Sequence, residues 1–330
     1  LAVQLPQLAV ALQPRRRRTA GKPHRPERLG QHRLTHSVAQ PPHASPMTMK
    51  HWSWIAASST GTSHLKHDLP LQDAQACAVV PVNSDSQTCD AEWFVAVACD
   101  GAGSASHGRQ GALITCRTIR QAARRHLAAA SKPSASSPQE ARLAASSLPS
   151  ADTVRTWADE ARQRIRAAAE RRGLSARDFA CTLVLALSNG QETLVAHIGD
   201  GGIVARLADG GTWQALSWPD HGEYASTTRF VTDEPPTPLR THITRQPIDA
   251  LALFSDGIER MVLDMATQTP FARFFSTMAA PLPKEPGKAH TLSSQLKAYL
   301  DSEAVNSRTD DDKTLVMAVL HPEASAQHRT

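Results

Sequence analysis

The feature that most restricts the fold of this chain is an apolar run that ends on a carboxylate. Trp93–Cys99 is short, aromatic and β-branched, as expected of a buried strand, and Asp100 follows it directly. Two further acidic positions have a similar setting, Asp256 after one apolar run and Asp310–Asp312 before another. Carboxylates at strand ends lie at the rim of a sheet. Three of them suggest a shared metal site.

The cysteine pattern and the hydropathy exclude several classes of protein. The chain has 330 residues, of which 41% are apolar, so a core can form without covalent cross-links. Its five cysteines are an odd number and show neither CxxC nor Cys/His ligand spacing, which argues against a disulfide framework and a zinc site. No stretch reaches the roughly 18 apolar residues that a membrane span needs. We therefore expect a cytoplasmic protein with reduced thiols and no membrane partner.

Positive charge is concentrated at the N-terminus. Residues 1–50 hold nine Lys and Arg against one Glu, a net +8, whereas the whole chain has +5, so the remainder carries −3. Residues 1–46 lack periodicity, and we expect a disordered basic extension there, one domain over 47–322 and a flexible tail over 323–330. A nucleic-acid arm is the functional alternative for Arg15–Arg18. Because no aromatic residues are interleaved, we expect a solvated tail and no nucleic-acid partner.

Strand-like and helical segments occur in blocks. Short apolar runs predict strands, and apolar spacings of three and four predict helices. The expected strands are Trp52–Ser58, Asp73–Val82, Trp93–Cys99, Cys181–Leu187, Thr193–Ile198, Ile203–Leu207, Ile248–Phe254 and Thr314–Leu320. The expected helices are Gly111–Ala130, Asp152–Arg172 with Asp152 as its cap, a helical start at Ile258–Met265, and Leu292–Ala304; residues 219–241 are expected to form a long loop.

Hairpin signals connect several of these strands. Trp93–Cys99 is expected to pair with Ala76–Val80, and the turn residues Asn189-Gly190 and Asp209-Gly210 support a meander of antiparallel strands. Because the strands are joined by hairpins rather than by alternating helices, their order favours an α+β layered sandwich over a parallel doubly wound sheet.

The acidic residues suit a site for hard divalent cations. Mg²⁺ and Mn²⁺ prefer oxygen ligands, and in proteins they usually take a few carboxylates while keeping several waters. Asp100, Asp256 and Asp312 supply such a set, and Gly101 lets the chain turn without a side chain obstructing the site. Two such ions about 4 Å apart would activate a water and neutralise the charge of a transferring phosphoryl group. The residues thus indicate hydrolysis of a phosphate ester.

Six segments, in order, resemble the motifs of the metal-dependent protein phosphatases of type 2C. They are Gln72-Asp73-Ala74, Val97–Gly103, Asp178–Thr182, His197–Gly201, Phe254–Gly257 and Asp311–Thr314. The resemblance covers residues 52–320 and implies a four-layer α-β-β-α sandwich, with two central antiparallel sheets flanked by helices. It also implies a binuclear Mg²⁺/Mn²⁺ centre, with a water or hydroxide between the ions that hydrolyses phosphoserine or phosphothreonine.

The resemblance implies a role for each residue that matches a motif. Asp100 would bridge both metals, and Gly101 would offer its carbonyl oxygen. Asp256 and Asp312 would hold one metal, so that Asp100, Asp256 and Asp312 are the expected catalytic carboxylates. Asp73 would support the second metal directly or through water.

The remaining motif residues are expected to contribute less or to differ. Asp178 resembles the carboxylate that helps to bind a third, weaker metal in bacterial members. Asp200 is left outside the site, because a turn-stabilising carboxylate is at least as plausible there as a catalytic one. The family's phosphate-binding arginine has no counterpart, so His64 or Lys66 is expected to bind phosphate. Ala102 stands where some members carry a histidine proposed as general acid, which leaves proton donation to a metal-bound water.

The implied partner is a phosphorylated protein, together with a cognate Ser/Thr kinase or its targets, and the expected oligomeric state is a monomer. Three alternatives stay open. The first is a catalytically weak pseudophosphatase that binds phosphoproteins. The second is an enzyme acting on a small phosphorylated metabolite. The third is a nucleic-acid-binding protein that acts through the arginine tail.

Overall fold

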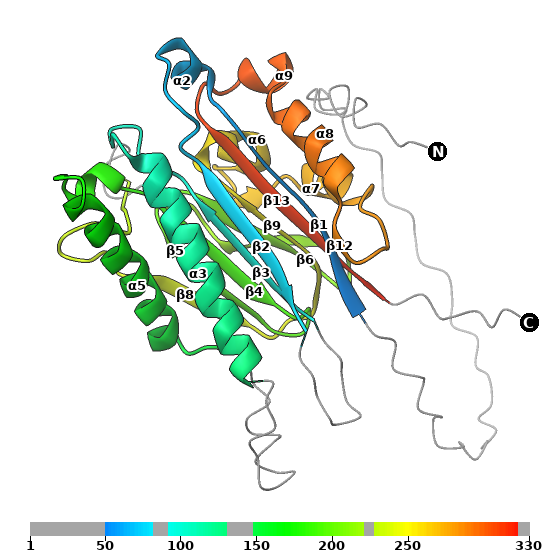
Figure 1. Cartoon of the computed structure of the whole chain (residues 1–330). Helices are drawn as coiled ribbons and strands as arrows, with labels where there is room; N and C mark the ends of the chain where they lie inside the picture. The colour runs from blue at the N-terminus through cyan, green and yellow to red at the C-terminus, as the bar shows by residue number, and fades with distance from the viewer. Residues whose placement is uncertain (1–49, 82–91, 131–147, 221–227, 323–330) are drawn as a thin grey trace, which may run out of the picture.

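Two stacked β-sheets form the body of the molecule (Figure 1). The computed structural model describes residues 50–81, 92–130, 148–220 and 228–322. The larger sheet has the strand order β12-β1-β13-β9-β6-β7, and the smaller sheet has the order β2-β3-β4-β5-β8. All pairings within these two sheets are antiparallel except that of β1 with β12.

The elements have the following bounds. The strands of the two sheets are β1 (Lys50–Ser59), β2 (Ala74–Val80), β3 (Trp93–Cys99), β4 (Leu183–Ser188), β5 (Thr193–Ile198), β6 (Gly202–Leu207), β7 (Trp213–Ser217), β8 (Arg240–Thr244), β9 (Ile248–Phe254), β12 (Gly287–Lys288) and β13 (Lys313–Pro322); β10 (Leu263–Asp264) and β11 (Thr269–Pro270) pair separately. The helices are α2 (Thr62–Lys66), α3 (Gly108–Ala130), α5 (Ala151–Glu170), η2 (Ala176–Phe179), η3 (Asp256–Ile258), α6 (Glu259–Val262), α7 (Ala272–Ala279), α8 (His290–Leu300) and α9 (Glu303–Asn306).

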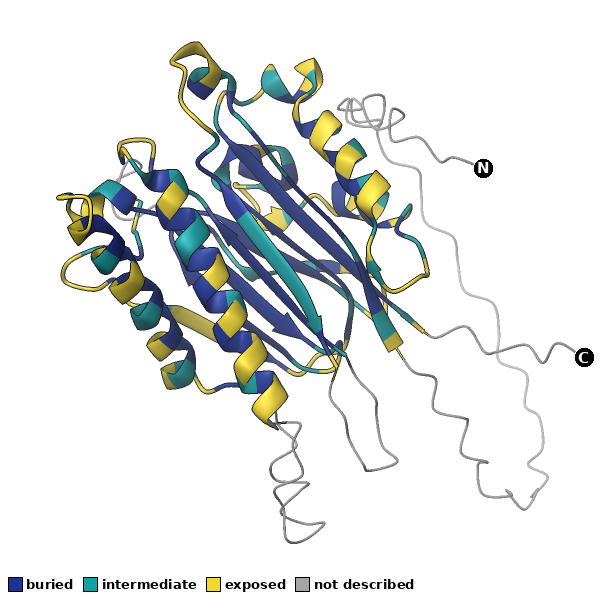
Figure 2. Cartoon of the chain, viewed as in Figure 1, coloured by how far each residue is buried: buried dark blue, intermediate teal, exposed yellow. Residues whose placement is uncertain are grey.

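The core between the sheets is built from side chains that alternate along the strands. Trp52 of β1 stacks on Phe94 of β3 with ring centroids 5.4 Å apart, and Val184 and Leu251 join the same cluster. In an antiparallel strand every second residue points to the same face. The buried colouring of the central strands in Figure 2 follows from this, because both faces of each sheet are covered.

Helices cover the outer faces of both sheets. Ile119 of α3 and Ile165 of α5 pack against the smaller sheet, while Phe275 of α7 and Leu296 of α8 pack against the larger one. The order of layers is therefore helix, sheet, sheet, helix (Figure 1). This confirms the predicted α+β four-layer sandwich.

Most predicted strands are present, and the hairpin of β2 with β3 has the expected register, with Ala76 opposite Val97. The predicted meander is wrong in one respect. β4 pairs with β5, but β6 belongs to the other sheet, so the chain crosses between the sheets within residues 199–201. The periodicity of a strand reports which side chains are buried and not which sheet the strand joins.

Several boundaries differ from the sequence-based expectation. The cap of α5 is Ser150, whose side chain accepts a hydrogen bond from the Thr153 backbone amide, and Asp152 lies in the first turn of the helix. A carboxylate in the first turn interacts favourably with the helix dipole. Asp is common both there and at the cap, so the sequence does not distinguish the two positions of Asp152. The expected helix at Leu292–Ala304 is two helices, α8 and α9.

Some expectations concern residues outside the described ranges. These are the disordered extension over 1–46 and the tail over 323–330. Within the described part of the chain, no helix is both long and apolar enough to span a bilayer.

Candidate metal centre

Four aspartates gather where strands of both sheets end. Asp73 directly precedes β2, and Asp100 directly follows β3. Asp256 is the first residue of η3, separated from the end of β9 by Ser255. Asp200 lies in the crossing between β5 and β6. Antiparallel neighbours place the start of one strand beside the end of the next, so these positions share one edge of the sandwich.

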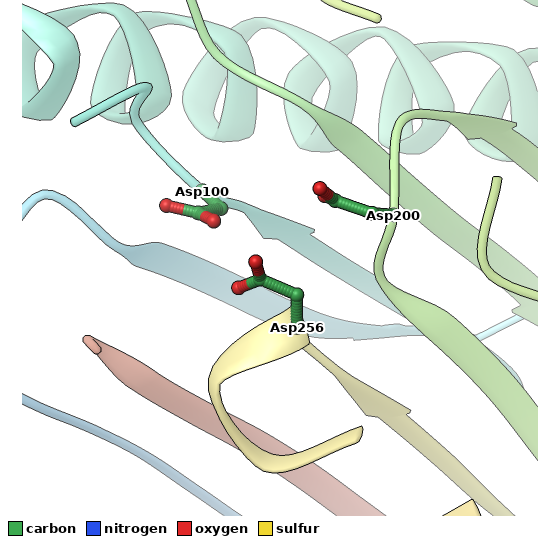
Figure 3. A group of neighbouring side chains, drawn as sticks. All are labelled: Asp100, Asp200 and Asp256. Carbon is green, nitrogen blue, oxygen red and sulfur yellow. The ribbon is translucent and has the colours of Figure 1, made fainter. Parts of the chain in front are cut away.

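Three of these carboxylates converge. Asp100, Asp200 and Asp256 each offer one oxygen, and these oxygens all lie within 4.8 Å of one another. Figure 3 shows the three side chains pointing toward a common space from three different segments. Asp200 is buried, and the other two are half-buried.

The convergence is electrostatically unfavourable without a cation. Burial is the largest cause of the high pKa values, which reach about 8 for Asp256 and lie well above the ordinary range for Asp100. Neighbouring carboxylates raise them further: Asp73 and Asp256 act on Asp100, and Asp200 acts on Asp256. Like charges at this distance cannot all ionise unless a positive charge joins them.

Buried oxygens without hydrogen-bond partners support the same interpretation. Among the described residues, none donates a hydrogen bond to the buried Asp73 Oδ1, Asp200 Oδ1 or Asp256 Oδ1. An unsatisfied buried carboxylate oxygen is costly, so such atoms point to a missing ligand. Clustered carboxylate oxygens are the donor set that Mg²⁺ and Mn²⁺ prefer, and the residues present fit such an ion.

The polypeptide around the centre holds two of the aspartates in place. The Asp100 backbone amide donates to Thr182 Oγ1 at 2.9 Å, and the Thr182 amide donates to the Asp100 carbonyl at 2.8 Å. Ser255 Oγ donates to Asp73 Oδ2 at 2.8 Å. Asp73 is fully enclosed, and burial raises its pKa to about 6.

Gly101 is needed for packing. A Cβ atom on Gly101 would lie 2.4 Å from the carbonyl carbon of Gly108, at the start of α3. The glycine therefore allows α3 to begin directly beside the Asp100 loop. This is a different reason for glycine from the expected one, the freedom of the turn, and the role of its carbonyl as a ligand stays a prediction.

The structure does not bring Asp312 into the converging group. Asp312 is buried, and its Oδ1 accepts from the Gly61 amide at 2.7 Å, while its Oδ2 accepts from the Gln72 amide at 2.5 Å. His64 Nδ1, on the buried side of α2, lies 3.1 Å from Asp312 Oδ1. Asp312 thus joins the segment that contains α2 to the start of β13.

Asp312 raises the pKa of Asp73, and its neighbour Asp311 acts on two other aspartates of the centre. The charge of Asp311 contributes to the raised pKa values of both Asp100 and Asp256. Burial raises the pKa of Asp311 itself; the hydrogen bond from the Asp312 backbone amide opposes this rise, and the charge of Asp312 adds to it. The sequence does not distinguish Asp311 from Asp312, because the two are adjacent and equally acidic.

The other predicted site residues lie outside the three-aspartate group. Asp178 Oδ2 accepts from the backbone amide and the hydroxyl of Ser175, which together form the cap of η2 and lower the pKa of Asp178. Ser106 Oγ donates to Asp178 Oδ1 at 3.3 Å. Lys66 is exposed on α2, whereas His64 is buried beneath that helix.

Asp200 is the residue that sequence reasoning left out. Its setting after Gly199 resembles a turn, and the chain bends there. The available signal was the pair of glycines that follow it: a Cβ on Gly201 would lie 2.7 Å from the Phe254 carbonyl oxygen, so the crossing approaches the end of β9 closely. That contact brings Asp200 beside Asp256.

A layered α+β sandwich with converging carboxylates at the sheet edge is an arrangement suited to a metal-dependent hydrolase. The comparisons with known proteins agree. Residues 60–301 match the family model described as protein phosphatase 2C. The chain is also 37% identical, over 273 residues, to serine/threonine-protein phosphatase 3 of Escherichia coli (strain K12), covering 81% of this chain and 98% of that protein. The chain belongs to the protein phosphatase 2C family and is an enzyme of that family.

Solved structures share the fold. A bacterial serine phosphatase superposes with a TM-score of 0.51 at 16% identity, covering 82% of this chain and 98% of that one. PppA, a key regulatory component of T6SS in Pseudomonas aeruginosa, superposes with a TM-score of 0.50 at 17% identity and the same coverage. At these identities the likeness concerns the fold alone.

Proposed function

We propose that this chain hydrolyses phosphoserine and phosphothreonine in proteins, with two Mg²⁺ or Mn²⁺ ions held by Asp73, Asp100, Asp200 and Asp256. The observation that carries the proposal is the convergence of three carboxylates, with buried oxygens left unpaired, at the edge of a phosphatase fold. The similarity to a serine/threonine-protein phosphatase over most of both chains supports the choice of substrate.

The residues of the chain prepare this chemistry. When bound, the ions would neutralise the phosphoryl oxygens and make a water nucleophilic near neutral pH. The backbone of Asp100 is held by Thr182 at the rim of the smaller sheet, so the point from which its carboxylate extends is fixed. Asp256 opens η3 at the end of β9 and approaches from the larger sheet. The reaction centre therefore combines groups from both sheets.

The roles of the outlying residues remain part of the proposal. Asp312 positions the segment of α2 through two backbone amides, which is a different role from the expected metal ligand. Gly101 offers its carbonyl as a ligand, and Asp178 contributes to a third, weaker metal site. His64 and Lys66, on the two sides of α2, are the hydrogen-bond donors for the phosphate.

The proposed function extends to the cellular setting. The substrate is a phosphorylated protein, the counterpart enzyme is a Ser/Thr kinase, and the working form is a monomer in the cytoplasm. The catalytic domain spans 47–322.

The second candidate is a pseudophosphatase that binds phosphoproteins without turning them over. It is favoured by one observation: the segment that precedes Asp73 offers histidine and lysine, where the resemblance leads us to expect a phosphate-binding arginine. Such a module would bind a phosphothreonine peptide and release no phosphate.

The test is metal-dependent release of phosphate from a phosphothreonine peptide and from p-nitrophenyl phosphate. We expect activity with Mn²⁺ or Mg²⁺, loss with EDTA, and little release from a phosphotyrosine peptide. Asp100→Asn and Asp200→Asn should each reduce kcat/KM by at least about a hundredfold, because each removes a converging charge from the reacting centre. Circular dichroism and thermal unfolding establish that the variants are folded.

The matched control is Asp249→Asn, which removes a half-buried carboxylate of β9 that pairs with Arg206 at 2.6 Å, far along the strand from Asp256. This variant should keep wild-type turnover. Wild-type turnover in Asp200→Asn would remove Asp200 from the centre. Binding of the phosphothreonine peptide without release of phosphate would establish the pseudophosphatase.

A further inference from the structure

Four arginines form a stripe along one side of α3. At 3.6 residues per turn their positions fall within about 80° of one another. We call this set the arginine stripe: Arg109, Arg117, Arg120 and Arg124. Arg125 lies on the opposite flank, where it pairs with Glu160 of α5 at 2.9 Å. The arginine stripe therefore faces away from α5.

The arginine stripe borders β2, the edge strand of the smaller sheet. Arg109 Nη1 donates to the Leu71 carbonyl at 2.6 Å, in the segment that leads into β2. In the middle of β2, burial raises the pKa of Cys77, and the positive charges of Lys288 and Arg120 counteract part of this rise. Positive charges from α3 and from β12 therefore both act on the middle of β2.

Among the described residues, the arginine stripe has few acidic neighbours to balance its charge. α3 contains five arginines and no acidic residue. Arg117 and Arg124 are exposed and form no ion pair with any described residue. Nε of the half-buried Arg120 has no hydrogen-bond partner among the described residues. By contrast, α5 carries acidic residues that pair with several of its arginines.

β2 itself is suited to an extended ligand. It pairs only with β3 among the described strands, and its five central residues, Gln75–Val79, are half-buried (Figure 2). An edge strand without a partner presents backbone donors and acceptors to an incoming chain. The surface between α3 and β12 thus combines the exposed Arg117 and Arg124 with the half-buried edge strand β2.

This surface begins at the metal centre. β2 starts at the residue after Asp73, and α3 starts shortly after the Asp100 loop, so both run away from the centre side by side (Figure 1). From Arg109 to Arg124 the helix rises about 22 Å, which matches roughly seven residues of an extended chain.

We propose that the arginine stripe, with β2 and Lys288, binds an acidic, extended segment of the phosphoprotein substrate that flanks its phosphorylated residue. The inference rests on the proposed function and adds to it the class of substrate. Charge complementarity selects an acidic segment, and the free edge of β2 selects an extended one. Acidic residues about three to ten positions from the phosphorylated residue would lie along the stripe.

The experiment compares phosphothreonine peptides that carry either four Glu or four Gln at those positions, on the N-terminal or the C-terminal side. For the wild-type enzyme, we expect the better-placed acidic peptide to have a KM about tenfold lower than its Gln counterpart at low salt, with a similar kcat. High salt should remove the difference, because exposed charges are screened. The double variant Arg117→Glu/Arg124→Glu should lose this preference and keep wild-type turnover of p-nitrophenyl phosphate.

The matched control is Arg155→Glu/Arg171→Glu, which changes the net charge equally on exposed positions of α5 and at its cap. It should keep the preference for the acidic peptide. Equal KM values for acidic and Gln peptides in the wild type, or a preference that survives in Arg117→Glu/Arg124→Glu, would overturn the inference while leaving the proposed function standing.

Two further outcomes are decisive. A wild-type enzyme that hydrolyses neither p-nitrophenyl phosphate nor any peptide overturns the proposed function, and the inference with it. Tighter binding of a DNA duplex than of the acidic peptide, lost in Arg117→Glu/Arg124→Glu, would assign the surface to nucleic acid and overturn the inference alone.

Discussion

His197 lies fully buried where β5, β7 and β8 meet. Its Nδ1 is 2.7 Å from Ser217 Oγ, and Arg240 donates to the same nitrogen at 3.0 Å. An Nδ1 that accepts a hydrogen bond from arginine must be unprotonated, so the imidazole is neutral. Burial, with a further contribution from Arg240, lowers the pKa of His197 to about 3.

This residue predicts a loss of stability in mild acid. The unfolded chain binds a proton at His197 below about pH 6.5, whereas the folded chain does so only near pH 3, so stability falls as the pH decreases between these values. At pH 5 the cost is about 2 kcal/mol. His197→Asn keeps an acceptor for Arg240 and does not titrate. Its free energy of unfolding in urea should therefore change less between pH 8 and pH 5 than that of the wild type.

The comparison of the two proteins isolates His197, because the aspartates of the metal centre titrate in both. Both are measured in EDTA. Equal losses of unfolding free energy between pH 8 and pH 5 would show that folding does not lower the pKa of His197.

Single residues of the centre were predictable to different degrees. Asp100 and Asp256 follow strongly apolar runs, and that pattern sufficed to select them. Asp200 lies in the short crossing between the sheets, where the sequence suggests a turn residue. Only the three-dimensional contact with β9 shows that it belongs to the metal centre. Asp312 and Asp311 differ by one position, and the direction of each side chain depends on how β13 begins.

At the scale of elements, the contact of η3 with the start of β13 fixes the position of Asp256. A Cβ atom on Gly257 would lie 1.9 Å from the carbonyl oxygen of Asp312. Both atoms belong to the backbone or are fixed to it, so no side-chain rotation can relieve the contact. The two segments must separate if a side chain is added.

Gly257→Ala is therefore expected to affect both stability and activity. We expect a loss of about 1–3 kcal/mol in the free energy of unfolding, the usual cost of overpacking, and a large decrease in p-nitrophenyl phosphate hydrolysis because Asp256 moves. Gly210→Ala is the control, since a Cβ there meets nothing closer than 3.9 Å. Urea unfolding and turnover are measured for both variants. A Gly257→Ala protein as stable and active as the control would contradict the contact.

The elements themselves were largely predictable, because their apolar periodicity is strong. β5 and β9 have the predicted bounds, and β3 pairs with β2 as expected. The short strands β7 and β8 and the helix α7 were not predicted. β8 is exposed along most of its length, so it lacks the apolar pattern on which the prediction depends.

At the scale of the whole molecule, the described fold begins at Lys50, and the basic extension lies before it. The first strand pairs along its full length with β13, so the sandwich is closed by residues within 50–322. We predict that deletion of residues 1–46 leaves the midpoint of thermal unfolding and the turnover of p-nitrophenyl phosphate unchanged. Scanning calorimetry and a kinetic assay test this.

The same deletion examines the alternative role of the arginine tail. Duplex DNA binding by the full chain that weakens with salt and vanishes on deletion would establish a nucleic-acid arm. A decrease of several degrees in the unfolding midpoint would instead show that the extension contacts the folded domain.

The position of β13 in the larger sheet affects how the protein folds during its synthesis. It is the last described strand, yet it lies inside the larger sheet between β1 and β9, ten residues of it aligned with β1. Pairing partners so distant in sequence close a very long loop, which slows folding. During synthesis on the ribosome, β1 and β9 must wait until the final segment emerges. The larger sheet, and with it the edge that presents Asp256, can only be completed after translation has passed residue 322.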